Sequence, residues 1–407
     1  MNFQSSLLRL LEERGYIHQA TDAGALDALA SQQIVSGYIG FDATAPSLHV
    51  GSLVQIMMLR RMQQAGHKPI VLMGGGTTKI GDPSGKDESR QLLTHEVIQA
   101  NIASIRRVFE HYLTFGDGPT DAIMVDNAEW LDRLAYIDLL RTVGPHFTVN
   151  RMLTFESVKL RLEREQPLTF LEFNYMILQA YDFRELSQRL GCRLQLGGSD
   201  QWGNIINGID LARRMDGAEL FGVTTPLITT ADGAKMGKTA SGAVWLNADQ
   251  LSAYDYWQFW RNTADSDVIK FLKLFTDVPL NQIKELAKLE GQAINEAKTR
   301  LANEATAMLH GREAANAAAE TAWRTFEEGM AGGELPTLSV PEGSINIVQA
   351  LTGLGFASSN GEARRKIGEG AVKLDGATIS DPQLIIEVTG EPLKLSLGKK
   401  KHGLLTA

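Results

Sequence analysis

Two short stretches, far apart in the chain, carry residue types that suit phosphate chemistry. The first is Leu-His-Val-Gly-Ser at 48–52, and the second is Lys-Met-Gly-Lys-Thr at 235–239. A histidine and a glycine at the start of a helix can hold phosphate, because free backbone N–H groups and the helix dipole favour anions there. A loop with two lysines can close on pyrophosphate as charge develops in the transition state. The ordinary alternatives are a chance His-x-Gly turn and a solvent-exposed loop with incidental lysines.

A third stretch, the glycine-rich 74–86, fails the tests for two common nucleotide-binding motifs. Asp87 stands where a P-loop needs Ser or Thr, and Ile80 stands where that motif needs glycine. Lys79 holds the place of the third glycine of a dinucleotide-binding fingerprint. Both motifs are therefore excluded for this stretch.

Residues 80–90 combine a turn sequence with charged side chains. The sequence Asp-Pro-Ser-Gly at 82–85 favours a turn, and a surface turn followed by a charged helix start is the ordinary interpretation. Lys86 and Arg90, four residues apart, would share one face of such a helix. We favour a functional role for the whole segment.

A polar stripe runs along the otherwise apolar segment 174–182. Tyr175, Gln179 and Asp182 stand at i, i+4 and i+7, which places them on one face of a helix. Buried polar side chains need hydrogen-bonding partners. The stripe therefore either forms internal hydrogen bonds or lines a ligand pocket.

The ten residues at 195–204, Gln-Leu-Gly-Gly-Ser-Asp-Gln-Trp-Gly-Asn, predict a strand that ends in a glycine turn and opens a helix. Glycine at this turn, including Gly198, lets a ligand approach the backbone. Asp200 can accept a hydrogen bond from a ribose hydroxyl. A tight turn with an N-cap aspartate is the alternative.

Hydrophobic patterns predict the elements that must position these residues. Residues 35–41 alternate like a strand, 52–64 have helical spacing before a glycine stop, and 69–73 form a short buried strand. Strand, helix and strand make a βαβ unit, hence a parallel sheet with ligands at the carboxyl ends of its strands. Residues 122–125 and 192–196 look like further strands.

At 407 residues the chain is too long for one ordinary core. We predict an α/β protein of several parts. Residues 1–222 form a Rossmann-like parallel-sheet catalytic domain, which contains a helical insertion, and a lysine-bearing mobile loop follows at 223–246. A helical domain at 247–330 is then joined by a Gly/Pro-bearing linker at 331–343 to a small α/β domain at 344–407.

Composition narrows the class of protein. A hydrophobic content of 43% with 22% charged residues is typical of a globular protein. No apolar run suits a membrane span and no signal peptide is visible, so we expect a cytoplasmic protein. A single cysteine, Cys192, excludes an internal disulfide and a Cys-rich zinc site, and we expect no protein metal site. The net charge is −8, but residues 344–407 are net basic, with eight lysines and arginines against six acidic residues.

In this order the motifs resemble the two signatures of the class I aminoacyl-tRNA synthetases. The stretch Gly40-Phe41-Asp42-x-Thr44 narrows the resemblance to bacterial-type tyrosyl-tRNA synthetases that carry a C-terminal S4 domain. The resemblance covers nearly the whole chain, from about Tyr38 to His402. It implies a tyrosine pocket in which Tyr38 and Asp182 bind the phenol of the substrate. Asp82, Tyr175 and Gln179 would bind its ammonium group, and Gln201 is the sixth residue implied to bind tyrosine.

The resemblance also implies which residues handle ATP. One departure from the family is Ser52, which replaces the usual second histidine, so any nucleotide contact there must be shorter or water-mediated. The implied catalytic residues are Thr44, His49, Lys86, Arg90, Lys235, Lys238 and Thr239. The implied ATP-binding residues are Gly40, Asp42, His49, Gly51, Ser52, Gly198, Asp200, Lys235 and Lys238.

The C-terminal piece resembles an S4 RNA-binding domain, because a basic helix is followed by a turn and a Val-Lys-Leu strand. A small oligomerisation or capping domain is the alternative. If the domain binds tRNA, phosphate contacts are expected from its clustered cations. These are Arg364, Arg365, Lys366, Lys399, Lys400 and Lys401.

The implied activity is that of a tyrosine-tRNA ligase, which uses L-tyrosine, ATP with Mg²⁺, and tRNA(Tyr). The implied assembly is a homodimer, formed through the helical insertion after the second strand. Tryptophanyl-tRNA synthetase is the nearest alternative, but Tyr38 and Asp182 argue against it, because an indole N–H can only donate. A non-charging RNA-binding relative is favoured only by Ser52 and opposed by the intact lysines.

Overall fold

A computed structural model of the chain describes residues 2–82, 93–231, 233, 236–239, 242–326, 335–340, 343–389, 392–398 and 401–406. For residues 156, 157, 238, 239, 325 and 326 it describes the backbone alone. The chain divides into two compact units. The first comprises Met1–Leu251 and Thr263–Leu301, and the second comprises Ser252–Asn262 and Ala302–Ala407.

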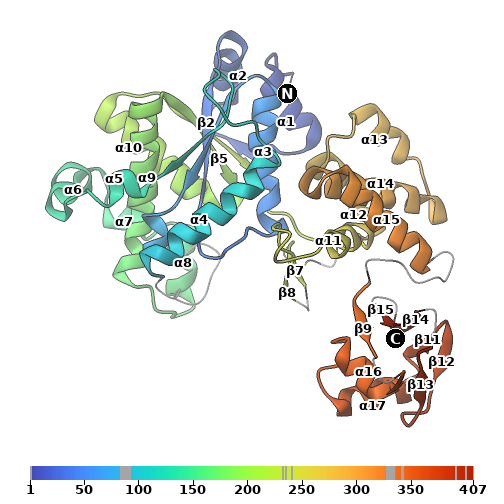
Figure 1. Cartoon of the computed structure of the whole chain (residues 1–407). Coiled ribbons are helices and arrows are strands. Elements are labelled where there is room, and N and C mark those ends of the chain that lie inside the picture. Colours follow the sequence, from blue (N-terminus) through green and yellow to red (C-terminus); the bar gives the residue numbers. More distant parts are fainter. Residues whose placement is uncertain are drawn as a thin grey trace. The chain divides into compact units, whose positions relative to one another are not determined.

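A six-stranded sheet lies at the centre of the first unit (Figure 1). Five strands run parallel, and the short edge strand β1 pairs antiparallel with β6. The predicted parallel-sheet fold is therefore confirmed. In spatial order the strands are β1 (Gln19–Ala20), β6 (Phe221–Thr225), β5 (Cys192–Gly198), β2 (Ser36–Phe41), β3 (Lys68–Met73) and β4 (Ile123–Asp126).

The chain leaves the centre of this sheet in two directions. Helix α3 (Val50–Gln64) connects β2 to β3, and α10 (Trp202–Asp216) connects β5 to β6 on the opposite side of the centre. Because such crossovers are right-handed, the two helices cover opposite faces of the sheet, as Figure 1 shows. The order of strands thus reverses between β2 and β5. A crevice at the carboxyl ends of these two strands is where a ligand is expected in an open α/β sheet.

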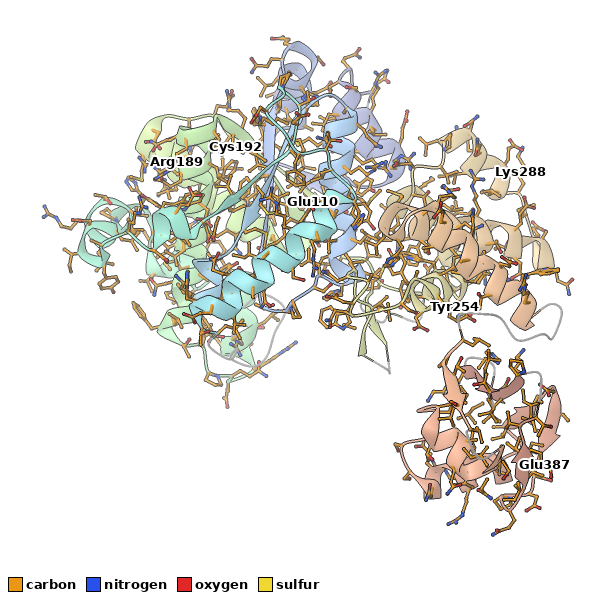
Figure 2. The ribbon with its side chains drawn as sticks, in the orientation of Figure 1. Glu110, Arg189, Cys192, Tyr254, Lys288 and Glu387 are labelled. Carbon is orange, nitrogen blue, oxygen red and sulfur yellow. The ribbon has the colours of Figure 1, made fainter. Side chains whose placement is uncertain are left out.

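Helix α9 (Phe170–Leu190) leads into β5 and carries the polar stripe. It begins with a capping box, in which Thr169 and Glu172 bond each other's backbone N–H groups, and it ends at Gly191 with φ 61°. Cys192 follows at once and is fully buried at the start of β5 (Figure 2). The two caps fix where α9 begins and ends, and therefore where its polar stripe lies relative to β5, which follows directly.

Other helices of the first unit surround the sheet or are inserted between its strands. Those before the insertion are α1 (Ser6–Arg14), α2 (Ala23–Gln32), η1 (Thr77–Lys79) and α4 (His95–Glu110). The insertion between β4 and α9 contains α5 (Ala128–Leu131), α6 (Tyr136–Thr142), η2 (Gly144–His146), α7 (Val149–Met152) and α8 (Glu156–Glu163). Later elements are η3 (Ser199–Gln201), α12 (Asp265–Phe275), α13 (Leu280–Leu286) and η4 (Gly291–Ala293).

The second unit contains a helical part and a small α/β part. In the helical part α11 (Ala253–Arg261) packs against α15 (Arg312–Phe326), and Trp257 donates to Asn303 on α14 (Ile294–His310). Up to Leu301, α14 belongs to the first unit. Helices α11 to α15 lie within the region 247–330 that was predicted to be a helical domain, but they are divided between the two units.

The α/β part is built on a five-stranded sheet. In spatial order its strands are β12 (Ala377–Ile379), β11 (Val372–Leu374), β14 (Leu393–Leu397), β15 (Lys401–Thr406) and β9 (Thr337–Ser339). A second, two-stranded sheet pairs β10 (Ser344–Asn346) with β13 (Ile385–Glu387), which carries Glu387 of Figure 2. Two helices, α16 (Ile347–Gly353) and α17 (Asn360–Gly368), complete it.

The small domain begins earlier than the sequence predicts. Strand β9 lies inside the predicted linker 331–343, yet it pairs in parallel with β15. Val340 belongs to the same buried core as Ile347 and Leu405. The segment looked like a linker because three residues of strand flanked by Pro and Gly carry no period that a sequence pattern can detect.

Candidate active site

A cleft of about 440 Å³ opens at the carboxyl ends of β2 and β5. It lies at the predicted switch point of the sheet. Its wall brings together the predicted pocket and nucleotide residues that the structure describes with side chains: Tyr38, Gly40, Asp42, Thr44, His49, Gly51, Ser52, Asp82, Tyr175, Gln179, Asp182, Gly198, Asp200 and Gln201.

Tyr38 and Asp182 occupy the buried end of this cleft. Both are almost fully buried, with exposed fractions of 1% and 2%. Burial, followed by the nearby carboxylate of Asp182, raises the pKa of Tyr38 well above its ordinary value, so its hydroxyl keeps its proton. Among the described residues the Tyr38 hydroxyl has no hydrogen-bond partner. It is therefore available to a polar group that enters the cleft.

Two residues that sequence reasoning missed hold the Asp182 carboxylate. Asn127 Nδ2 donates to Oδ2 at 2.9 Å, and Trp130 Nε1 donates to Oδ1 at 2.7 Å. Burial raises the pKa of Asp182 to about 7, although these two hydrogen bonds oppose the shift. Asn127 and Trp130 follow β4, so only the pairing of β3 with β4 brings them under α9. Each oxygen of Asp182 keeps capacity for one further donor.

The outer end of the same pocket is lined by amides and carboxylates. Gln201 connects two of the predicted residues, because its Nε2 donates to Asp82 Oδ2 at 3.1 Å and its Oε1 accepts from Gln179 at 3.3 Å. The Tyr175 hydroxyl donates to Asp42 Oδ2 at 3.3 Å. Carboxylates and hydroxyl acceptors gathered in this way suit a cationic group such as an ammonium.

Three glutamines that line the cleft have a buried oxygen without a partner among the described residues. These oxygens are Gln55 Oε1, Gln179 Oε1 and Gln195 Oε1. Gln195, only 3% exposed, is a further residue that sequence reasoning did not single out, although it is the first residue of the motif at 195–204, inside β5. Buried acceptors of this kind are costly unless a ligand or water satisfies them.

The start of α3 differs from the sequence-based expectation. Its backbone N–H groups were expected to be free for phosphate, but Val50 N donates to Val244 O and Ser52 N donates to His49 O. Gly51 N donates to Nδ1 of His49 at 3.0 Å. Residue 244 comes from the lysine-bearing loop, so this contact has no local sequence signal. In a neutral imidazole the proton then sits on Nε2, and His49 can donate it to an oxygen that gains charge.

The lysine-bearing loop packs directly on the start of α3. Strand β7 (Lys238–Thr239) pairs with β8 (Gly242–Ala243), and residue 245 bridges to His49. Gly237 adopts φ 87°, and a Cβ there would lie 2.6 Å from the Gly51 nitrogen, so glycine is required. The motif lysine Lys235, like Lys86 and Arg90, lies outside the described residues.

At the ribose motif, Gly198 and Asp200 lie against each other. A Cβ on Gly198 would come within 2.5 Å of Asp200 Oδ1. The N-cap of α10 is Gln201, without a side-chain cap, so Asp200 is not the N-cap that the ordinary interpretation requires. The carboxylate therefore lies in the cleft wall next to bare backbone.

The predicted tRNA-contacting cations on α17 lie on the part of the helix that faces away from the domain core. Ala363 and Ile367 face the domain core, whereas Arg364 and Arg365 are exposed. Lys366 Nζ bonds Glu369 at 2.7 Å, and Arg365 lies 3.7 Å from the same carboxylate. Lys401 Nζ donates to the carbonyl of Phe356 at 2.9 Å. Lys399 and Lys400 lie outside the part of the chain that the structure describes.

None of the helices in the described ranges combines the length and the apolar character that a membrane span requires. No group of three or more His, Cys, Asp or Glu side chains in the described part could hold a metal ion.

Comparisons with known proteins agree over the whole length of the chain. The family described as tRNA synthetases class I (W and Y) matches residues 31–327. The Tyrosine--tRNA ligase SYY-like C-terminal domain matches residues 326–405.

Individual relatives support the same assignment. A "Tyrosine--tRNA ligase" of Novosphingobium aromaticivorans is 69% identical over 99% of this chain and 98% of that protein. One of Zymomonas mobilis is 68% identical over 100% of this chain and 99% of that protein. The solved C-terminally truncated mitochondrial tyrosyl-tRNA synthetase of Aspergillus nidulans has a TM-score of 0.72 and 30% identity, covering 79% of this chain and 95% of that chain. The chain therefore belongs to the tyrosyl-tRNA synthetase family of class I.

Proposed function

We infer that this chain is a tyrosine-tRNA ligase. It activates L-tyrosine with ATP to give tyrosyl-adenylate and pyrophosphate, and it then transfers the tyrosyl group to the 3'-terminal adenosine of tRNA(Tyr). The observation that carries this inference is the match, end to end, to relatives named "Tyrosine--tRNA ligase" at 57–69% identity.

The site itself favours tyrosine over tryptophan. Asp182 presents carboxylate oxygens at the buried end of the cleft, and Tyr38 presents a hydroxyl with no partner among the described residues. A phenol both donates and accepts, so it can satisfy this pair. An indole N–H only donates and would leave the Tyr38 hydrogen unsatisfied.

The chemistry of the first step needs no covalent nucleophile from the protein. A carboxylate oxygen of tyrosine attacks the α-phosphorus of ATP; the new O–P bond forms as the bond from that phosphorus to the bridging oxygen of pyrophosphate breaks. In the second step a ribose hydroxyl of the terminal adenosine attacks the tyrosyl carbonyl carbon, and AMP leaves. The protein's contribution is positioning and charge stabilisation.

We assign roles in the cleft on this basis. Tyr38 and Asp182 bind the phenol, and the outer polar groups bind the ammonium: Asp82, Tyr175, Gln179 and Gln201. His49 donates from Nε2 to a phosphate oxygen, and Thr44 assists it. Asp200 and Gly198 accept the ribose, with Gly40, Asp42, Gly51 and Ser52 in the nucleotide wall. Lys86, Arg90, Lys235, Lys238 and Thr239 hold the pyrophosphate, and Mg²⁺ accompanies ATP, bound mainly by phosphate oxygens and water.

We also propose a homodimer in the cytoplasm. The helical insertion exposes large apolar side chains, which is unusual for a surface that faces only water. Ile137 is 63% exposed, Val149 61% and Tyr136 54%. Sedimentation at micromolar concentration should give twice the chain mass, and a monomer would contradict this part.

The tRNA is proposed to contact the C-terminal domain through Arg364, Arg365, Lys366, Lys399, Lys400 and Lys401. Arg364 and Arg365 are exposed on α17, which suits phosphate contacts. In terms of domains, the catalytic sheet would carry activation and the small domain would hold the tRNA.

Pyrophosphate exchange with the purified protein and each amino acid in turn tests the activity. Exchange should require tyrosine, and charging should require tRNA(Tyr). Exchange that depends on tryptophan, or binding of RNA without charging, would overturn the inference.

A further inference from the structure

A continuous chain of hydrogen bonds joins the two ends of the proposed tyrosine pocket. At the outer end, Asp42 accepts from the Tyr175 hydroxyl at 3.3 Å on Oδ2 and from the Thr77 hydroxyl at 2.9 Å on Oδ1. At the buried end, Asn127 Nδ2 donates to Thr77 Oγ1 at 3.1 Å and to Asp182 Oδ2 at 2.9 Å. Thr77 is the member that connects the two halves.

The direction of every bond in this chain is determined. Asn127 Oδ1 accepts from the backbone N–H groups of Gly76 at 2.7 Å and Thr77 at 3.4 Å, so its amide cannot be reversed. The Thr77 hydroxyl accepts from that amide, and its single hydrogen goes to Asp42. The single hydrogen of Tyr175 also goes to Asp42. Toward an ammonium, the Tyr175 oxygen therefore acts as an acceptor.

Burial makes the chain stiff. Thr77 is 3% exposed, Asn127 1% and Asp182 2%. A Cβ on Gly74 would lie 2.4 Å from Asp42 Oδ1 and 2.5 Å from Thr77 Oγ1, so bare glycine backbone closes the space around this bond. In such a site a lost partner leaves a buried donor or acceptor unsatisfied, and the neighbouring bonds weaken with it.

We propose that Thr77 is a positioning residue that couples recognition of the ammonium to recognition of the phenol. Its hydroxyl orients Asp42, which directs Tyr175, and it anchors Asn127, which directs Asp182. This inference rests on the proposed roles of Tyr175 and Asp182. Without the hydroxyl, Asn127 loses an acceptor and Asp42 loses a donor, so both ends of the pocket loosen together.

The first test compares Thr77→Val, which keeps the shape of the side chain and removes the hydroxyl, with Thr77→Ser, which keeps the hydroxyl. In pyrophosphate exchange, Thr77→Val should raise the KM for tyrosine about tenfold, the effect of one lost buried hydrogen bond. The KM for ATP should change less, because among the described side chains bonded to the Thr77 hydroxyl only Asp42 also belongs to the proposed nucleotide wall. Thr77→Ser should stay near wild type. If the two variants behave alike, or if the KM for ATP rises as much as the KM for tyrosine, Thr77 is a packing residue and the proposal is wrong.

The second test measures the coupling itself. Calorimetry compares tyrosine with phenylalanine, which lacks the phenol hydroxyl, and with 3-(4-hydroxyphenyl)propionate, which lacks the ammonium. In Thr77→Val both losses of affinity should be several-fold smaller than in wild type. If only the preference for the ammonium shrinks, Thr77 orients Asp42 but not Asn127. If both preferences stay as in wild type, Thr77 orients neither residue. Both outcomes overturn the coupling.

Two control variants separate this proposal from the pocket assignment. Tyr175→Phe should reduce the ammonium preference, and Asp182→Asn should reduce the phenol preference. If these two variants bind all three ligands like wild type, the assignment of the pocket fails and the coupling fails with it. If they behave as expected while Thr77→Val is silent, the coupling alone is wrong. Unfolding temperatures confirm that each variant is folded.

Discussion

At the scale of single residues, Asp182 determines which amino acid the cleft accepts. We expect Asp182→Ala to narrow the preference for tyrosine over phenylalanine about ten- to hundredfold, because a hydrogen bond to a charged acceptor is lost. Exchange rates for the two amino acids measure this ratio. The matched control is Asp216→Ala. In the unaltered protein the Asp216 carboxylate pairs with Arg184 on the outside of α9 and α10, so its removal should leave the ratio unchanged. An unchanged ratio in Asp182→Ala would remove Asp182 from the phenol site.

The raised pKa of Asp182 predicts a pH dependence. Burial lifts this pKa from the ordinary 3.8 to about 7, so folding favours the protonated carboxyl. Its contribution to stability is complete below the ordinary value and is lost as pH rises through about 7. Tyrosine binding has the opposite trend, because the ionised carboxylate accepts the phenol best. From pH 6 to 8 tyrosine affinity should rise about tenfold, following the ionised fraction.

Calorimetric titration at several pH values measures this trend, with phenylalanine as the ligand that lacks the phenol. Asp182→Asn supplies the matched variant, since it keeps the shape of the side chain but does not titrate. Tyrosine affinity that stays flat in wild type across this range would contradict the assignment.

Sequence reasoning found part of this residue set and missed the rest for a physical reason. Tyr175, Gln179 and Asp182 share one helix, and the helical period makes their common face visible in the sequence. Thr77 and Asn127 lie in short turns after β3 and β4, where no period operates. Asn127 meets both Thr77 and Asp182, and Thr77 and Asn127 come together because those strands pair in the sheet.

At the scale of elements, α3 is held at both ends by distant segments. Its first N–H groups bond residues 244 and 49, and Arg61 near its last turn bonds Asp277 and the carbonyl of Thr276 after α12. Arg14 from α1 donates to the carbonyls of Thr276 and Val278. The strand and helix positions were predictable from hydrophobic period, but these anchors join segments about two hundred residues apart. No local pattern could reveal them.

We expect Asp277→Asn to destabilise this anchor. Burial alone would raise the pKa of Asp277, but Arg60 and Arg61 hold it well below its usual range. Stability from this group is present above the ordinary pKa and lost as pH falls below it. The loss in free energy of unfolding should be about 2 kcal/mol, less than for a fully buried pair, because the Asp277 side chain is 36% exposed and Arg61 is 1% exposed.

Urea unfolding at neutral pH measures this difference. Arg107→Gln is the control, because its pair with Asp249 is exposed on both sides and should contribute within about 0.5 kcal/mol. Equal losses for the two variants would show that the anchor contributes no more than a surface ion pair.

At the scale of the whole molecule, the first strand of the small domain determines where the chain can be truncated without disrupting a folded part. The linker is shorter than its Gly and Pro content suggests, because β9 pairs with β15 and Val340 enters the domain core. A protein that ends at Gly343 would keep β9 without its partner strand and would expose an unpaired edge. The cut that leaves both parts whole falls after α15, which ends at Phe326.

A protein that ends at Phe326 should therefore activate tyrosine like the full chain but charge tRNA poorly. The cleft residues all precede this point, and a solved relative of 30% identity is itself C-terminally truncated. Pyrophosphate exchange should be unchanged within a factor of two or so, whereas charging should fall on the order of a hundredfold, because phosphate contacts supply much of the affinity for nucleic acid. In the full chain, replacing Arg364 and Arg365 with Gln should weaken tRNA binding and flatten its salt dependence, since fewer counterions are released. Normal charging by the truncated protein would show that the small domain is a structural appendage, and a loss of exchange would show that it supports the catalytic sheet.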